Sequence, residues 1–204
     1  MKIDKVALIG LLLALGSAQF MVAMMLGEAT APEYSMHDSA ISDLGTIDET
    51  RLLFNASLFA IGMFNALAGY LLYGVIKDRI VIVVFVLGGV GAMGAGVIPL
   101  DSKIGLHGLF ALVAFLFMNV EAILIARHVG NPLRIVSLVA GVIGIIFTVM
   151  MLLVDSESID VSGSIGHGGT ERMIAYPLLV WMMIFGGYLL GSIAPFEAAR
   201  TKTT

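Results

Sequence analysis

The chain has 204 residues, is 59% hydrophobic and 13% charged, and has a mean hydropathy of +1.01. A soluble domain is about 45–50% apolar and about 25% charged, so this composition is that of a membrane-embedded protein. The net charge of −4 and the lack of a basic run exclude a nucleic-acid binder, and the absence of cysteine excludes disulfides, thiolate metal sites and iron–sulfur clusters.

Six segments are long and apolar enough to cross a bilayer, which takes about 20 residues because the hydrocarbon is about 30 Å thick. In chain order they cover about 5–27, 52–76, 80–98, 106–126, 135–154 and 172–194. The apolar run of the first segment, about 20 residues, exceeds the about 7–15 of a signal peptide, so we expect it to stay as a helix. The sequence therefore predicts an all-α fold, with residues 1–204 forming one six-helix transmembrane bundle.

Basic and acidic residues separate between alternate loops. The two terminal segments and the turns at 77–79 and 127–134 carry eight of the eleven basic residues, whereas the other loops carry eleven of the fifteen acidic residues. Because Lys and Arg stay on the cytoplasmic side, we expect a multi-pass protein of the cell membrane with both termini in the cytoplasm. The two longer loops, after the first and the fifth span, then lie outside.

Small residues recur every four positions in three of the predicted spans. They are Gly10, Ala14 and Ala18 in the first span, Gly88, Ala92 and Gly96 in the third, and Gly187 and Gly191 in the sixth. Small residues on one helix face allow close backbone approach, which is what holds helices together in lipid. We expect these faces to pack helices within one chain, or to join two copies in a homo-oligomer.

The two outer loops carry local signals of their own. In the first, Ile41 and Leu44 lie one turn apart before Gly45, which predicts a short interfacial helix with a glycine stop. In the second, His167 stands among four glycines between 163 and 169. That composition indicates a loop that folds tightly or lets another backbone approach closely, with a floppy connector as the alternative.

Titratable side chains gather at the outer ends of the predicted spans. They are His37, His107, His167, Asp43, Asp101, Glu171 and Arg172. In a compact bundle they lie around one outward mouth, where carboxylates and imidazoles favour acid–base chemistry. His37, His107 and His167 are also candidate ligands of a divalent metal such as zinc, although their spacing matches no known metal motif. The alternative is an interfacial network of hydrogen bonds and ion pairs, for example between Arg172 and Asp43 or Asp101.

Few polar side chains lie deep inside the spans. The notable ones are Asn55, Asn65, Asn119 and Glu121. Glu121 is the one carboxylate well within a span, and a charged group at that depth is a functional candidate by default. It lies within about 40° of His107 on one helical face, so the two residues could mark the ends of a polar path. The alternative is a neutral, hydrogen-bonded Glu121.

Several short motifs resemble those of the polytopic membrane family known as domain of unknown function 998. They are Ile41-Ser42-Asp43-Leu44-Gly45, Phe54-Asn55, Gly96 with Pro99, Asp101 and His107, and Gly169 with Glu171-Arg172. The resemblance runs from the first span to the last. It implies a six-helix membrane protein with polar motifs gathered at one face, and it implies no particular reaction.

Four functions remain open from the sequence. The first is an enzyme whose outward-facing site acts on a lipid or another amphiphile by acid–base or metal-assisted chemistry, with Arg172 holding an anionic headgroup. The second is a small proton-coupled transporter that uses Glu121. The third, a haem protein with two histidine ligands, lacks facing histidines within the spans. The fourth is a non-catalytic subunit that organises lipids or an assembly, and in every case membrane lipids are the expected partners.

Overall fold

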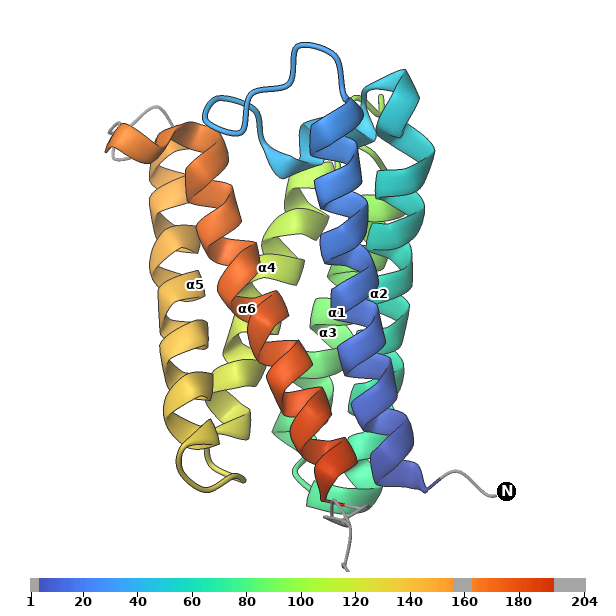
Figure 1. Ribbon diagram of the computed structural model, residues 1–204, viewed down its shortest axis with the longest axis vertical. Helices are drawn as coiled ribbons and strands as arrows, with labels where there is room; N and C mark the ends of the chain where they lie inside the picture. The colour runs from blue at the N-terminus through green and yellow to red at the C-terminus, as the bar shows by residue number, and fades with distance from the viewer. Residues whose placement is uncertain (1–3, 156–162, 193–204) are drawn as a thin grey trace, which may run out of the picture.

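The computed structural model describes residues 4–155 and 163–192, and all regular structure within these ranges is helical (Figure 1). The six long helices are α1 (Lys5–Thr30), α2 (Asp48–Ile76), α3 (Arg79–Val97), α4 (His107–Ile125), α5 (Leu133–Asp155) and α6 (Gly166–Gly191). Two short 3-10 helices, η1 (Ile41–Gly45) and η2 (Gly163–Ile165), precede α2 and α6. Each long helix has the length and hydropathy of a membrane span, so the predicted six-helix all-α architecture is confirmed.

The helices form a closed ring in which each packs against its neighbours in sequence and α6 returns to α1. Helix α6 runs obliquely, beside α5 at the upper end of Figure 1 and beside α1 at the lower end, and it also touches α4. The α1–α2 and α3–α4 connections lie at the upper end, called here the loop end. The short turns after α2 and α4 lie at the lower end, called the turn end, where α1 begins and α6 ends (Figure 1).

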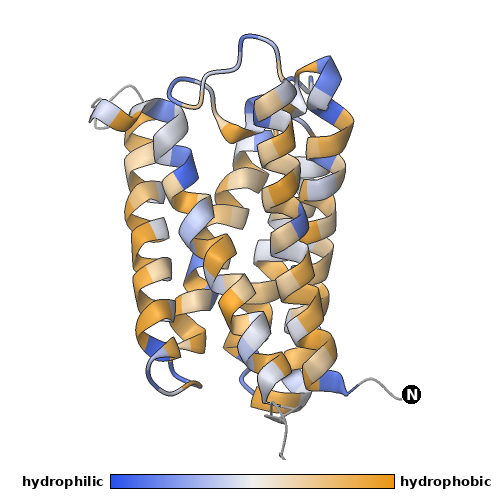
Figure 2. Ribbon diagram, viewed as in Figure 1, coloured by the Kyte–Doolittle hydropathy of each residue, from blue (hydrophilic) through white to orange (hydrophobic). Residues whose placement is uncertain are grey.

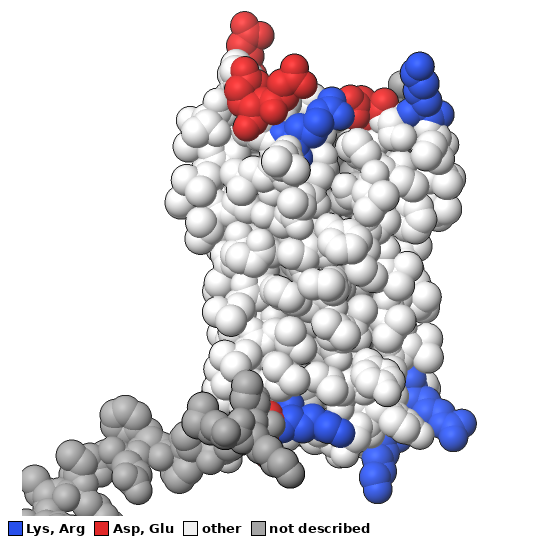
Figure 3. Space-filling model, turned by 90° about the vertical axis from the view of Figure 1, so that its right-hand side faces the viewer, with Lys and Arg blue, Asp and Glu red and all other residues white. Residues whose placement is uncertain are grey.

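An apolar belt lies between these two ends. Hydrophobic residues dominate the middle of the helices in Figure 2, and the face seen in Figure 3 carries its charged side chains at the two ends only. Large apolar side chains such as Leu52 and Ile146 are exposed on the outside of the ring, as expected where lipid is the solvent. The end that faces the cytoplasm stays a prediction from the charge distribution.

Glycines bring several neighbouring helices into backbone contact. Gly62 of α2 and Gly89 of α3 face each other, since a β-carbon on Gly62 would lie 2.6 Å from the carbonyl oxygen of Gly89. Gly10 of α1 packs in the same way on Gly186 of α6, at 2.7 Å from its carbonyl oxygen. The glycine of α6 that packs on α1 is therefore Gly186, whereas the predicted Gly187 and Gly191 meet nothing within 4 Å. Association between two copies stays a prediction.

The largest difference from the predicted spans is at the start of α6. The sequence predicts a start at residue 172 because of the preceding glycines, whereas the helix begins at Gly166. The outer loop lies directly on this first turn: the backbone N–H of Gly168 donates to the carbonyl of His37 at 2.9 Å. A β-carbon on Gly168 would meet the backbone of Met36 at 2.6 Å, so the glycines serve close backbone approach inside a helix. The predicted end at 194 lies outside the described residues.

Candidate functional site

A cavity of about 400 Å³ opens at the loop end between η1, α4, α5 and α6. Its polar lining residues are Ser42, His107, Thr148, Asp155, His167 and Glu171. Its apolar lining includes Leu112, Phe115, Met151 and Leu152. A second space of about 50 Å³, lined mainly by apolar residues of α1, α2 and α4, shares Ser42, His107 and Glu171 with it. We call these the outer cavity and the inner chamber.

His107 is the first residue of α4, and its side chain is held between the two cavities at 4% exposure. Its Nδ1 lies 2.8 Å from the carbonyl oxygen of Ile98 and 3.2 Å from that of Ala95. A carbonyl oxygen only accepts hydrogen bonds, so Nδ1 must carry a proton and donate it. The second ring nitrogen, Nε2, has no hydrogen-bond partner among the described residues. The neutral ring therefore keeps a free lone pair on Nε2.

Glu171 lies in the second turn of α6 and lines both cavities at 4% exposure. One carboxylate oxygen, Oε2, accepts a hydrogen bond from the backbone N–H of Ile41 at the start of η1. The other oxygen, Oε1, has no partner in the described part of the chain. The hydrogen bond from Ile41 thus fixes one oxygen of this carboxylate, and the other oxygen can accept a hydrogen bond from a ligand.

At the rim of the outer cavity, Asp155 and His167 join the end of α5 to the first turn of α6. His167 Nε2 lies 3.1 Å from Asp155 Oδ1, and both side chains are partly exposed. The pair is therefore in contact with water at the mouth, whereas His107 and Glu171 lie deeper.

Arg172, next to Glu171, points to a different side of α6 and is 5% exposed. Its Nε and Nη2 donate to Glu28 at 3.0 and 2.8 Å, and Nη2 also donates to the Tyr34 hydroxyl at 2.5 Å. Burial raises the pKa of the Tyr34 phenol to about 12 in spite of the adjacent guanidinium. Nη1 donates to the carbonyls of Met36, Ser39 and Gly168.

These contacts, called here the Arg172 clamp, fasten the outer loop to α1 and α6. They use every donor of the guanidinium, so the side chain has none left for the anionic headgroup that the sequence suggested. The structure pairs Arg172 with Glu28 rather than with Asp43 or Asp101. Arg172 therefore stabilises the fold beside the cavity and does not contact a ligand in it.

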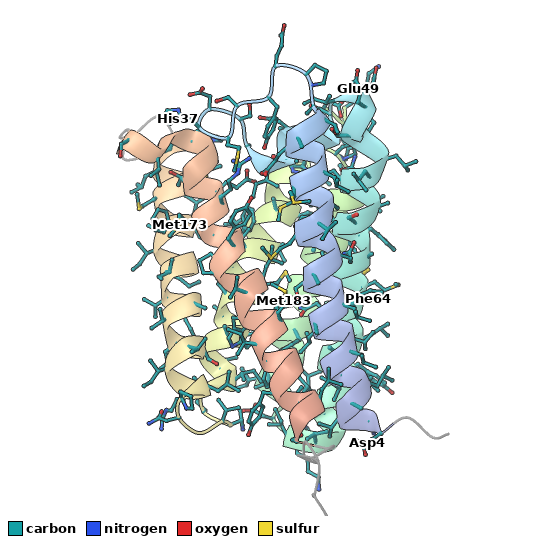
Figure 4. All side chains as sticks on the ribbon, viewed as in Figure 1. Asp4, His37, Glu49, Phe64, Met173 and Met183 are labelled. Atoms are coloured by element: carbon teal, nitrogen blue, oxygen red, sulfur yellow. The ribbon has the colours of Figure 1, made fainter. Side chains whose placement is uncertain are left out.

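The remaining predicted site residues lie outside both cavities. Asp43 accepts from the backbone N–H of Ala40 at 2.8 Å and holds the start of η1. Asp101 pairs with Arg51 at 2.5 Å, and this guanidinium holds the pKa of the carboxyl below its usual value. His37 is exposed on the outer loop (Figure 4) and pairs with Asp38 at 2.6 Å. The cavity thus gathers His107, His167 and Glu171 and leaves these three residues elsewhere.

The geometry does not support a zinc site. In residues 4–155 and 163–192, no three His, Asp or Glu side chains are grouped so that they could hold a metal ion. In particular, His37 and His167 have separate acidic partners, Asp38 and Asp155, and only His107 and His167 share a cavity.

The intramembrane polar residues lie in three separate places. Glu121 is fully buried and accepts from the Asn65 amide at 2.9 Å, between α4 and α2. Asn119 points instead toward α5 and α6, where it donates to the carbonyl of Ile174 and lies against Gly144. Asn55 donates to the carbonyl of Gly45 at the loop end. Neither cavity is lined by Glu121, so the predicted polar path from His107 is not visible in them.

Sequence reasoning did not select three polar residues of the cavity: Ser42, Asp155 and Thr148, whose hydroxyl donates to the carbonyl of Gly144 within α5. Ser42 stands in the motif that resembles the family, and Asp155 directly follows the apolar end of α5. Both signals were present, but neither residue is unusual where helices end at a membrane surface. Glu28 was also left out of the site, because its partner Arg172 is 144 positions away.

Comparison with known proteins identifies the family of the chain but no activity. A family model described as "Protein of unknown function (DUF998)" matches residues 14–188 and confirms the resemblance. No curated protein and no solved structure matches the chain.

Proposed function

Since the chain belongs to the DUF998 family of membrane proteins, whose function is open, we propose from its geometry that the outer cavity binds an amphiphile and that His107 accepts a proton from its polar group. The free lone pair on the buried Nε2 of His107 carries this proposal. It is the one titratable nitrogen of the cavity whose tautomer is fixed and whose acceptor atom has no partner in the described residues.

An amphiphile suits the lining of the outer cavity. Polar residues of η1 and α6 lie at one side, and α4 and α5 contribute Leu112, Phe115, Met151 and Leu152. From His107 to Phe115 the cavity follows α4 for eight residues, about 12 Å. A molecule with a polar head near His107 and an apolar body along these side chains would bury both parts in matching surroundings.

Two contacts of His107 support a role as a general base. The carbonyls of Ile98 and Ala95 orient the ring, and they stabilise the imidazolium that forms when Nε2 takes a proton. Glu171 lines the same cavity with a carboxylate that Ile41 holds in place, and it adds negative charge near that imidazolium. Transport through Glu121 lacks a comparable observation, because neither cavity reaches that residue.

The test is a comparison of His107→Gln with His37→Gln. Each protein is reconstituted in vesicles of total bacterial lipid, and mass spectrometry follows the lipid species that are consumed or formed. General acid–base catalysis contributes about 10²–10⁴ in rate, so we expect His107→Gln to convert lipid at least about a hundredfold more slowly than the parent protein. Glutamine keeps an N–H for the carbonyl of Ile98, which favours retention of the fold.

The His37→Gln protein is the matched control, because His37 is exposed and lies outside both cavities. It should convert lipid at the parent rate. Equal rates for His107→Gln and the parent protein, or lipid that the parent protein leaves unchanged, would contradict the proposal.

A further inference from the structure

The charge of the outer cavity points to the kind of head group that it accepts. Among the residues that the structure describes, its charged or titratable lining consists of two carboxylates, Asp155 and Glu171, and two imidazoles, His107 and His167, with no Lys or Arg. The arginines at this end are already paired, Arg51 with Asp101 and Arg172 with Glu28. A ligand in the cavity therefore meets negative or neutral groups.

The unpaired atoms of the cavity are mostly hydrogen-bond acceptors. His107 Nε2 and Glu171 Oε1 each belong to a side chain that is 4% exposed, and neither atom has a partner among the described residues. His167 Nε2 lies beside Asp155, which leaves one further carboxylate oxygen at the rim. An ammonium group carries three donors and no acceptor, so it is complementary to this set.

We propose that the outer cavity selects a cationic amphiphile, with its ammonium group between His107 and Glu171 and its alkyl chain along α4 and α5. This inference rests on the proposed function for the location of the site, and it adds the class of ligand. It replaces the anionic head group expected from Arg172, whose donors are used within the protein.

An anionic head group is disfavoured by the same arrangement. A phosphate or carboxylate here would lie near Glu171 and Asp155, with no Lys or Arg in the described lining to bind it, and it would face acceptor atoms that donate nothing to it. An ammonium head is compatible with the acceptor role of His107, since one of its N–H groups can donate a hydrogen bond to Nε2 while its charge stays beside the Glu171 carboxylate.

The experiment uses ligands that share one alkyl chain and differ in the head. The purified protein in a neutral detergent is titrated at pH 7.5 with dodecylammonium, dodecanol and dodecyl phosphate, and binding is followed by the shift in Tm and by calorimetry. We expect dodecylammonium to bind about tenfold or more tightly than dodecyl phosphate, because a hydrogen bond to a charged group contributes about 1.5–3 kcal/mol.

Three variants locate the preference. Glu171→Gln keeps an oxygen for the N–H of Ile41 and removes the charge, and Asp155→Asn does the same at the rim. We expect Glu171→Gln to weaken dodecylammonium binding about tenfold or more, Asp155→Asn to weaken it less, and Glu49→Gln to leave it unchanged. Glu49 is an exposed acid at the same end and lines neither cavity (Figure 4).

Two results would overturn the inference: dodecyl phosphate binding as tightly as dodecylammonium, or Glu171→Gln and Asp155→Asn both binding the amine like the parent protein. The outcome also separates the two proposals. Selective amine binding without any lipid turnover would leave the ligand class standing and remove His107 as a base. Lipid turnover that depends on His107, without a preference for the amine, would support His107 as a base and remove the cationic ligand class.

Discussion

Replacement of Arg172 by methionine is expected to destabilise the folded protein by about 3–5 kcal/mol, the usual cost of removing one partner from a buried ion pair. Glu28 would keep only the hydroxyl of Tyr176, at 3.2 Å, as a hydrogen-bond donor to its Oε1. The carbonyls of Met36 and Ser39 would lose the guanidinium as well, so the outer loop would be held to α6 by fewer bonds, among them those from Gly168 to His37 and from Ile41 to Glu171.

The measurement is reversible unfolding of the detergent-solubilised protein, with Arg51→Met as the matched control. Arg51 forms an exposed ion pair with Asp101 at the same end of the bundle, and exposed pairs contribute little to stability. Arg172→Met and Arg51→Met proteins of equal stability would show that the Arg172 clamp is unimportant. The double variant Glu28→Gln, Arg172→Met should lose less than the sum of its single changes, because each single change strands the other partner.

Substitution of Gly89 by valine is expected to cost about 3 kcal/mol, the upper part of the range for overpacking a core, and to lower the yield of folded protein. A β-carbon at Gly89 would lie 2.8 Å from the backbone nitrogen of Ala66 and still closer to the carbonyl of Gly62. Backbone atoms cannot change rotamer to make room, so α2 and α3 would have to separate along their whole contact.

Gly187→Val serves as the control for this change, because Gly187 is also a helical glycine in a span but meets nothing within 4 Å. Thermal unfolding is measured as the fraction of protein that still elutes as a folded peak in size-exclusion chromatography after heating. The midpoint temperature of Gly187→Val should be close to that of the parent protein. If Gly89→Val unfolds at the same temperature as the parent protein, α2 and α3 tolerate a wider separation, and the prediction is wrong.

The six spans could be predicted because the bilayer sets both the length and the composition of a crossing helix. The predicted starts of α1 and α3 agree with the structure to within one residue, since polar residues stand directly before the apolar run. The start of α6 was wrong by six residues. Its glycines favour a loop when only local propensity is considered, and the reason for a helix lies in the backbone of Met36 to Ser39, far away in sequence.

The candidate site could be predicted in part for a similar reason. His107 and Glu171 stand near helix starts at the loop end, so topology alone brings them close to each other. The separate pairings of Arg172, Asp101 and His37 depend on which residue of another segment lies nearest, and span positions do not contain that information. The fixed tautomer of His107 likewise depends on two carbonyls at the end of α3.

Glu171 and Arg172 point to different sides of α6, and each has its own fixed contact, so together they determine the rotation of this helix about its axis. Successive residues of an α-helix are about 100° apart around its axis, so a single inserted residue before Glu171 would turn both side chains by that angle. The carboxylate would then leave the cavity and the guanidinium would leave Glu28. Turning the helix back by the same angle would restore both contacts, but it would move the first turn of α6 away from the backbone of Met36 and Ser39. Insertions and deletions between the outer loop and this turn should therefore be far less tolerated than substitutions, even among the glycines that precede it.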